Sequence, residues 1–315
     1  GYIENVFREL GLKHGVGDSY KQAVPFVELA NRPSDALKID GKGEPLELRY
    51  GNEAVYWTKR VVPEVSIQNS ELVFVGYGIV DAALGWNDYA GLDMKGKTAV
   101  ILVNDPGYAT GDEDLFNGRA MTYYGRWTYK YEEASRQGAA GAIIVHGEKP
   151  AASPWAVVQN GAARPQLDID APDGNADCVA IEGWMTRDSA ERVFAAAGLD
   201  YDQMKARAAK PGFKPVSMGL NASASVRNAV RRATSSNVIG LVEGSKRPDE
   251  YVIVTAHWDH LGKALAFAGD SVFNGAIDNA TGMAALLELA RAFTEVQPRP
   301  ERPVIFAALT GEESG

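Results

Sequence analysis

The sequence predicts an α/β protein whose mixed, mostly parallel sheet carries helices on both faces. Near-continuous runs of Val, Ile and Leu lie at residues 238–242, 251–256 and 303–309. Runs of this kind are typical of strands that are covered on both faces. A helix is expected over residues 281–296, because apolar side chains recur there at helical spacing: Met283, Leu286, Leu287, Ala290 and Phe293. Strands on either side of an amphipathic helix are typical of an α/β architecture.

Length and composition limit the classes of protein that remain. The chain has 315 residues, which at about 150 residues per domain allows roughly two domains. Its formal net charge of −9 argues against nucleic acid as a partner, because neutralising phosphates requires an excess of Lys and Arg. No apolar run approaches the roughly 20 residues that span a bilayer, so we expect no membrane span. The single cysteine, Cys178, has no partner for an intramolecular disulfide.

The first zone, residues 1–65, begins with an expected amphipathic helix. Its apolar side chains share one face over residues 2–12, and Gly11 is a plausible stop signal. Strand-like stretches follow at residues 23–29 and 54–57. No charged segment followed by an apolar one is found at this end, so we expect that any signal peptide has been removed.

The middle zone, about residues 66–213, alternates short β-type runs with turns rich in Gly and Asp. Runs at residues 72–80 and 98–103 predict strands. A helix is expected over residues 127–137, where Gly138 follows as a C-terminal stop, and a strand at residues 142–145 comes next. This order predicts a small α/β or β-rich module.

The third zone, residues 214–315, holds three polar segments at the ends of apolar elements. They span residues 257–262, 275–279 and 311–315. Ligands of α/β sheets gather outside the carboxyl ends of the strands. We therefore expect the functional side chains directly after residues 256 and 310.

The side chains of these segments suit metal-assisted hydrolysis. His257 offers a ring nitrogen, and Asp259 lies on the same side of an extended chain, where it can hold the other ring nitrogen. Asp278 can bridge two ions through its two oxygens. Glu312 and Glu313 point to different sides, so that one can bind metal while the other stays free as a general base. Taken singly, each residue is more often a packing residue, a helix cap or part of a solvated face, and only their combination points to a metal site.

Four motifs together resemble the start of the catalytic domain of the M28 family of co-catalytic zinc peptidases, the aminopeptidase type. They are Asn237-Val238-Ile239-Gly240, Ala256-His257-Trp258-Asp259-His260-Leu261-Gly262, Gly275-Ala276-Ile277-Asp278-Asn279-Ala280-Thr281-Gly282 and Ala308-Leu309-Thr310-Gly311-Glu312-Glu313. Residues 66–213 are similar to the protease-associated (PA) domain that many members carry as an insertion. Residues 1–65 resemble the part of the peptidase domain that precedes it, and residues 214–315 its first catalytic part.

The resemblance implies a site with two zinc ions. His257 would ligate one ion, Asp278 would bridge both, and Glu313 would ligate the other. Glu312 would be the general base that takes a proton from the attacking water, and Asp259 would orient His257. The zinc ions would polarise the scissile carbonyl and activate the water.

Two further properties follow from the same resemblance. The family often has a non-proline cis peptide after the bridging Asp, which would be Asp278–Asn279 here. It also uses an Asp and a late His downstream of the Glu-Glu pair, and neither lies before Gly315. We therefore expect a fragment, truncated at both ends, that is inactive on its own. None of His14, His146 and His260 occupies a family ligand position, and His260 is expected to pack or to hydrogen-bond locally.

The expected function is that of a secreted or periplasmic zinc aminopeptidase, which removes N-terminal residues from peptides. Peptides are the expected partners, and the oligomeric state is not readable from the sequence. Two alternatives stay open. One is a carboxypeptidase or dipeptidase of the M28 type, and the other is a non-catalytic scaffold that uses the PA domain for interactions.

Overall fold

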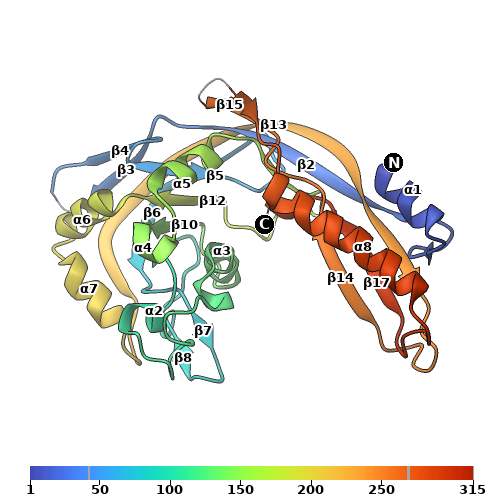
Figure 1. Cartoon of the computed structure of the whole chain (residues 1–315). Coiled ribbons are helices and arrows are strands. Elements are labelled where there is room, and N and C mark those ends of the chain that lie inside the picture. Colours follow the sequence, from blue (N-terminus) through green and yellow to red (C-terminus); the bar gives the residue numbers. More distant parts are fainter. Residues whose placement is uncertain (42, 268–269, 315) are drawn as a thin grey trace. The chain divides into compact units, whose positions relative to one another are not determined.

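The computed structural model describes residues 1–41, 43–267 and 270–314, and the chain forms two compact units (Figure 1). Unit 1 combines residues 1–28, 167–170 and 232–315. Unit 2 combines residues 29–166 and 171–231. In the described part of the chain, no helix has both the length and the apolar character that crossing a membrane requires.

The helices are α1 (Tyr2–Glu9), α2 (Pro106–Thr110), α3 (Trp127–Arg136), α4 (Glu148–Ala151), α5 (Trp155–Ala162), α6 (Arg187–Ala196), α7 (Tyr201–Ala208) and α8 (Thr281–Glu295). Short helical turns are η1 (Tyr123–Gly125), η2 (Ala276–Ala280) and η3 (Glu312–Ser314). The strands are β1 (Lys13–His14), β2 (Lys21–Pro33), β3 (Ala36–Gly41), β4 (Leu46–Arg49), β5 (Ala54–Trp57), β6 (Glu64–Phe74), β7 (Val80–Asp81), β8 (Trp86–Asn87), β9 (Thr98–Leu102), β10 (Gly141–Val145), β11 (Gln166–Ile169), β12 (Ile181–Met185), β13 (Val216–Val242), β14 (Val252–His257), β15 (Lys263–Phe267), β16 (Asp270–Val272) and β17 (Val304–Leu309).

Unit 1 is built on the parallel pair β14 and β17. The end of β13, residues 238–242, runs antiparallel to β17, and β1 runs antiparallel to β13. Helices α1 and α8 join these strands in one hydrophobic cluster, in which Phe7, Leu286 and Phe306 are buried. The strands predicted at residues 251–256 and 303–309 and the predicted helix are confirmed to within one residue at each end. The run at residues 238–242 is a strand as predicted, but it is only the end of the much longer β13, which begins at Val216.

Unit 2 contains the larger parallel sheet. Strands β6, β9, β10 and β12 are parallel neighbours, and β5 adds an antiparallel edge beside β12. Side chains alternate along β9, so that Val100 belongs to one hydrophobic cluster and Ile101 to another. Helices α6 and α7 contribute to the first cluster, and α3 and α5 to the second. The predicted α/β class, a mixed, mostly parallel sheet with helices, is confirmed. The larger parallel part lies in unit 2, whereas the prediction was made from residues 238–309, where β14 and β17 form a parallel pair.

One predicted strand is interrupted. The run at residues 72–80 stays extended only to Phe74, and β7 begins at Val80. Gly76 and Gly78 adopt φ of +58° and +62° between them. This left-handed backbone is accessible to glycine but ends a strand, so Tyr77 lies at a turn. The expected domain boundaries, and the identity of residues 66–213 as a PA domain, stay predictions.

Candidate metal centre

The polar segments of unit 1 follow the carboxyl ends of two parallel strands. His257 is the last residue of β14 and lies opposite Leu309, the last residue of β17. Turn η3, which carries Glu312 and Glu313, starts three residues after β17 ends. Turn η2 brings Asp278 beside β14 just ahead of α8. The side chains predicted from the sequence therefore gather at one edge of this sheet.

His257 is at the centre of the cluster. Its Nε2 lies 3.1 Å from Asp278 Oδ1 and 3.6 Å from Glu312 Oε2. The histidine is only 7% exposed, whereas the side chains of Asp278 and Glu312 are 64% and 56% exposed. A buried imidazole thus faces carboxylates that solvent, and a ligand, can reach.

A second histidine joins the cluster. Nδ1 of His260 lies 2.6 Å from Oε1 of Glu313. One group of donor atoms within 4.8 Å of one another comes from His257, Glu312 and Glu313, and a second comes from His260, Asp278 and Glu313. The sequence interpretation assigned His260 no ligand position, although its place three residues after His257, in the same polar segment, was a usable signal. Its hydrogen bond is long-range in sequence, not local.

Asp259 holds the cluster together differently from the expectation. Nδ1 of His257 lies 3.0 Å from the backbone carbonyl oxygen of Asp259, while the carboxylate is 3.9 Å away. The Asp259 carboxylate accepts hydrogen bonds from the backbone N–H groups of Glu312 and Glu313, both at 3.3 Å. Asp259 therefore orients the ring through its main chain and links the two polar segments through its side chain.

The charges around His257 favour its protonated form when no metal is bound. Burial alone lowers the pKa of the imidazole. The hydrogen bond to the Asp259 carbonyl and the negative charges of nearby carboxylates, with Glu312 the strongest, more than offset this effect. The pKa of His257 is consequently raised above its ordinary value. The site thus attracts positive charge.

The backbone around Asp278 depends on glycine and on a local hydrogen bond. Gly275 has φ of +64°, and a Cβ there would lie 2.7 Å from the Asp278 carbonyl oxygen. Oδ1 of Asn279 accepts a hydrogen bond from the Gly282 N–H at 2.9 Å, which ties this turn to the start of α8. The peptide bond Asp278–Asn279 is cis, as predicted.

The donor set fits zinc. Zinc takes imidazole nitrogens and carboxylate oxygens, and the ring nitrogen of a ligand histidine that does not bind metal commonly bonds to a carbonyl or carboxylate. In this chain Nδ1 of His257 is engaged with the Asp259 carbonyl, so Nε2 is the nitrogen that faces Asp278 and Glu312. Imidazole and carboxylate donors at the carboxyl ends of parallel strands define a candidate centre of the metal-dependent hydrolase class.

Comparison with known families agrees with this class. Residues 237–315 match the model of "Peptidase family M28". The matched segment contains every residue of the candidate metal centre.

Curated relatives match the chain over a limited stretch. "Aminopeptidase NAALADL1" of Mus musculus is 37% identical over 112 residues, which cover 33% of this chain and 14% of the mouse protein. A "Probable zinc metalloprotease" of Pyrenophora teres f. teres (strain 0-1) is 36% identical over 81 residues, which cover 25% of this chain and 17% of the fungal protein. The matched stretch thus spans less than a fifth of the length of either relative.

Two solved structures align with nearly the whole chain at low sequence identity. "Aminopeptidase from Aneurinibacillus sp. strain AM-1" aligns with 100% of this chain and 57% of its own, at 22% identity and a TM-score of 0.44. A Shewanella amazonensis SB2B structure described as "Peptidase M28 precursor" aligns with 99% of this chain and 58% of its own, at 17% identity and a TM-score of 0.38.

Proposed function

We propose that this chain supplies part of the active site of a zinc-dependent aminopeptidase, which hydrolyses the N-terminal residue from peptides. The observation that carries the proposal is the convergence of His257, Asp278 and Glu312 at the carboxyl ends of β14 and β17. The family of residues 237–315 and the names of the curated relatives support a peptidase.

Each residue of the cluster would have a distinct role. His257, Asp278 and Glu313 would hold the metal, and the bridging role of Asp278 rests on the family resemblance. Glu312 is 56% exposed and carries a carboxylate that can take the proton of the attacking water. Asp259 keeps the backbone of both glutamates near His257 through its two hydrogen bonds. Bound zinc would supply Lewis acidity toward the peptide carbonyl and lower the pKa of water.

His260 adds a feature that the family resemblance does not assign. Its ring contacts Glu313 at 2.6 Å, so it would orient that carboxylate toward the metal.

The experiment measures turnover and zinc content of the protein that contains this chain, with L-leucine p-nitroanilide as substrate. Glu312→Gln keeps the side-chain shape but removes the base, so turnover is expected to fall by about 10²–10⁴-fold. Zinc content, measured by mass spectrometry, should stay near that of the unmodified protein. Glu295→Gln, at an exposed glutamate at the end of α8, is the matched control and should change neither quantity.

Three outcomes would contradict parts of the proposal. Full turnover of Glu312→Gln would remove the general-base assignment. Cleavage of N-acetylated peptides with a free carboxyl end, and not of C-terminally amidated peptides, would favour the carboxypeptidase alternative. A zinc-loaded protein that hydrolyses neither kind of peptide would favour the non-catalytic scaffold.

A further inference from the structure

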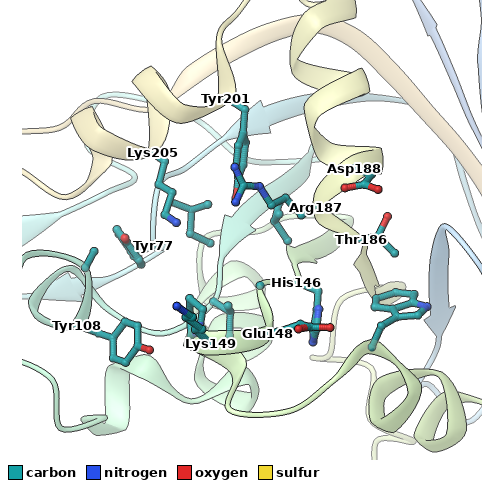
Figure 2. A pocket seen from close by; sticks show the side chains of 17 residues that line it. Tyr77, Tyr108, His146, Glu148, Lys149, Thr186, Arg187, Asp188, Tyr201 and Lys205 are labelled. Carbon is teal, nitrogen blue, oxygen red and sulfur yellow. The ribbon is translucent and has the colours of Figure 1, made fainter.

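Unit 2 contains a pocket of about 720 Å³ (Figure 2). This pocket shares no lining residue with the candidate metal centre of unit 1. It opens where three parallel strands end. Leu102 is the last residue of β9, Val145 is the last of β10, and Thr186 directly follows β12. Pockets of about 300–1,000 Å³ take small molecules, and ligands of parallel sheets bind at this edge. The place and the size both suit a small ligand.

The pocket wall carries charges of both signs, and four of these side chains form no salt bridge in the described part of the chain. Lys149 and Lys205 line it, and so do Glu148 and Asp188. Over residues 1–41, 43–267 and 270–314, none of these four side chains forms a salt bridge. Arg187 differs, because it pairs with Glu191 at 2.8 Å and with Asp202 at 3.3 Å. Two ammonium groups and two carboxylates are therefore available to a ligand.

Aromatic side chains form much of the remaining wall. Tyr77 and Tyr201 are 2% and 9% exposed, and Tyr108, which belongs to α2, also lines the pocket. None of these three hydroxyl groups hydrogen-bonds to another residue in the described part of the chain. Burial raises the pKa of Tyr201 to about 12, so its phenol stays protonated and can donate a hydrogen bond.

The position of Tyr77 is set by groups beneath the pocket. Nζ of Lys130, which is fully buried, donates a hydrogen bond to the Tyr77 carbonyl oxygen at 2.6 Å. The flanking Gly76 and Gly78 allow the turn that presents the ring. The wall is therefore formed before a ligand arrives, which lowers the cost of binding.

We propose that this pocket binds an α-amino acid, or a short peptide, as a zwitterion. The ligand carboxylate would pair with Lys149 and Lys205, and its ammonium group would pair with Glu148 and Asp188. The aromatic wall would take an apolar side chain. A zwitterion matches the balanced free charges, whereas inorganic phosphate would meet repulsion from both carboxylates. This site does not depend on peptidase activity.

Isothermal titration of the whole 315-residue chain tests the proposal, with EDTA present so that no substrate is turned over. The probes are L-phenylalanine and glycyl-L-phenylalanine. N-acetyl-L-phenylalanine lacks the ammonium group and L-phenylalaninamide lacks the carboxylate. We expect saturable binding of at least one zwitterionic probe, and at least about tenfold weaker binding of each blocked compound. The zwitterionic probe that binds more tightly shows whether a free amino acid or a short peptide is the preferred ligand.

Variants locate the binding. Lys205→Met should weaken binding at least about tenfold, because it removes one charge-assisted hydrogen bond. Lys149→Met tests the same charge pattern at an exposed side chain, where the substitution disturbs no core contact. Lys210→Met changes an exposed lysine outside the pocket lining and is the matched control, for which binding should be unchanged. Circular dichroism verifies that each variant is folded.

The proposal is overturned if neither zwitterionic probe shows saturable heat up to about 10 mM. It is also overturned if L-phenylalaninamide binds as tightly as L-phenylalanine, or if folded Lys149→Met and Lys205→Met both bind like Lys210→Met.

Discussion

Replacing Gly311 by Ala is expected to destabilise unit 1 at the start of the Glu312-Glu313 turn. Gly311 has φ of +82°, and a Cβ there would lie 2.5 Å from Cζ of Phe26. Phe26 is 7% exposed, so its ring has little free space into which to move. The substitution thus combines backbone strain with a steric clash.

The two contributions can be separated. An L-residue in left-handed backbone costs about 1–2 kcal/mol. Overpacking against a buried ring adds about 1–3 kcal/mol. Gly311→Ala should therefore lower the free energy of unfolding of unit 1 by about 2–5 kcal/mol. Gly262→Ala is the matched control, because Gly262 has φ of +69° but its Cβ would meet no atom within 4 Å. Gly262→Ala should lower the free energy of unfolding only by the backbone contribution of about 1–2 kcal/mol.

Urea unfolding monitored by fluorine NMR of 5-fluorotryptophan measures this difference. Trp258 is the single tryptophan in the sequence ranges of unit 1, so its signal reports on that unit. With a slope of about 1–3 kcal/mol per molar urea, the midpoint for Gly311→Ala should lie about 1 M below that for Gly262→Ala. Equal midpoints would refute the steric argument, since only the φ cost would remain.

Three further changes have expected results. Asp259→Asn leaves one acceptor for the two backbone N–H groups of Glu312 and Glu313, so zinc affinity should fall about 10–100-fold in chelator competition; unchanged affinity would argue against the linking role. Burial raises the pKa of Asp88 to about 7 from 3.8, so its stabilising effect is full below pH 3.8 and is lost as pH rises toward 7. The urea midpoint of unit 2 should therefore fall as the pH rises from 3.8 to about 7. Asp88→Asn should remove the part of this decline that Asp88 causes, and an equal decline in the variant would assign the pH dependence to other groups. Phe306→Ala removes a fully buried ring that packs on Phe293 and should cost about 3–5 kcal/mol of unfolding free energy in unit 1; a loss below 1 kcal/mol, measured by the same fluorine signal, would contradict that burial.

Periodicity in the sequence was sufficient to predict α8, β14 and β17 of unit 1, although not its short strands β1, β15 and β16. The helix expected over residues 281–296 is α8 (Thr281–Glu295), and the buried run at residues 303–309 is β17. Such elements are readable because apolar side chains repeat with the period of the backbone that buries them. The run at residues 72–80 was misjudged, because hydropathy does not reveal whether Gly76 and Gly78 adopt positive φ.

For the candidate metal centre, the sequence by itself determined which side chains are available and that they follow strand ends. His257, Asp278, Glu312 and Glu313 were all identified in this way. Only the tertiary structure brought His260 to within 2.6 Å of Glu313, a residue 53 positions away. It also decided that Asp259 meets the His257 ring through a backbone carbonyl, which no side-chain pattern encodes.

The pocket of unit 2 shows most clearly what the sequence alone does not determine. Glu148, Lys149, Asp188 and Lys205 are ordinary charged residues in the sequence, spread over 58 positions, and no motif joins them. Parallel strands with crossover helices bring their carboxyl ends together at one edge, which places these side chains around one space. Local order thus follows from the sequence pattern, whereas the meeting of distant side chains depends on how the strands pair.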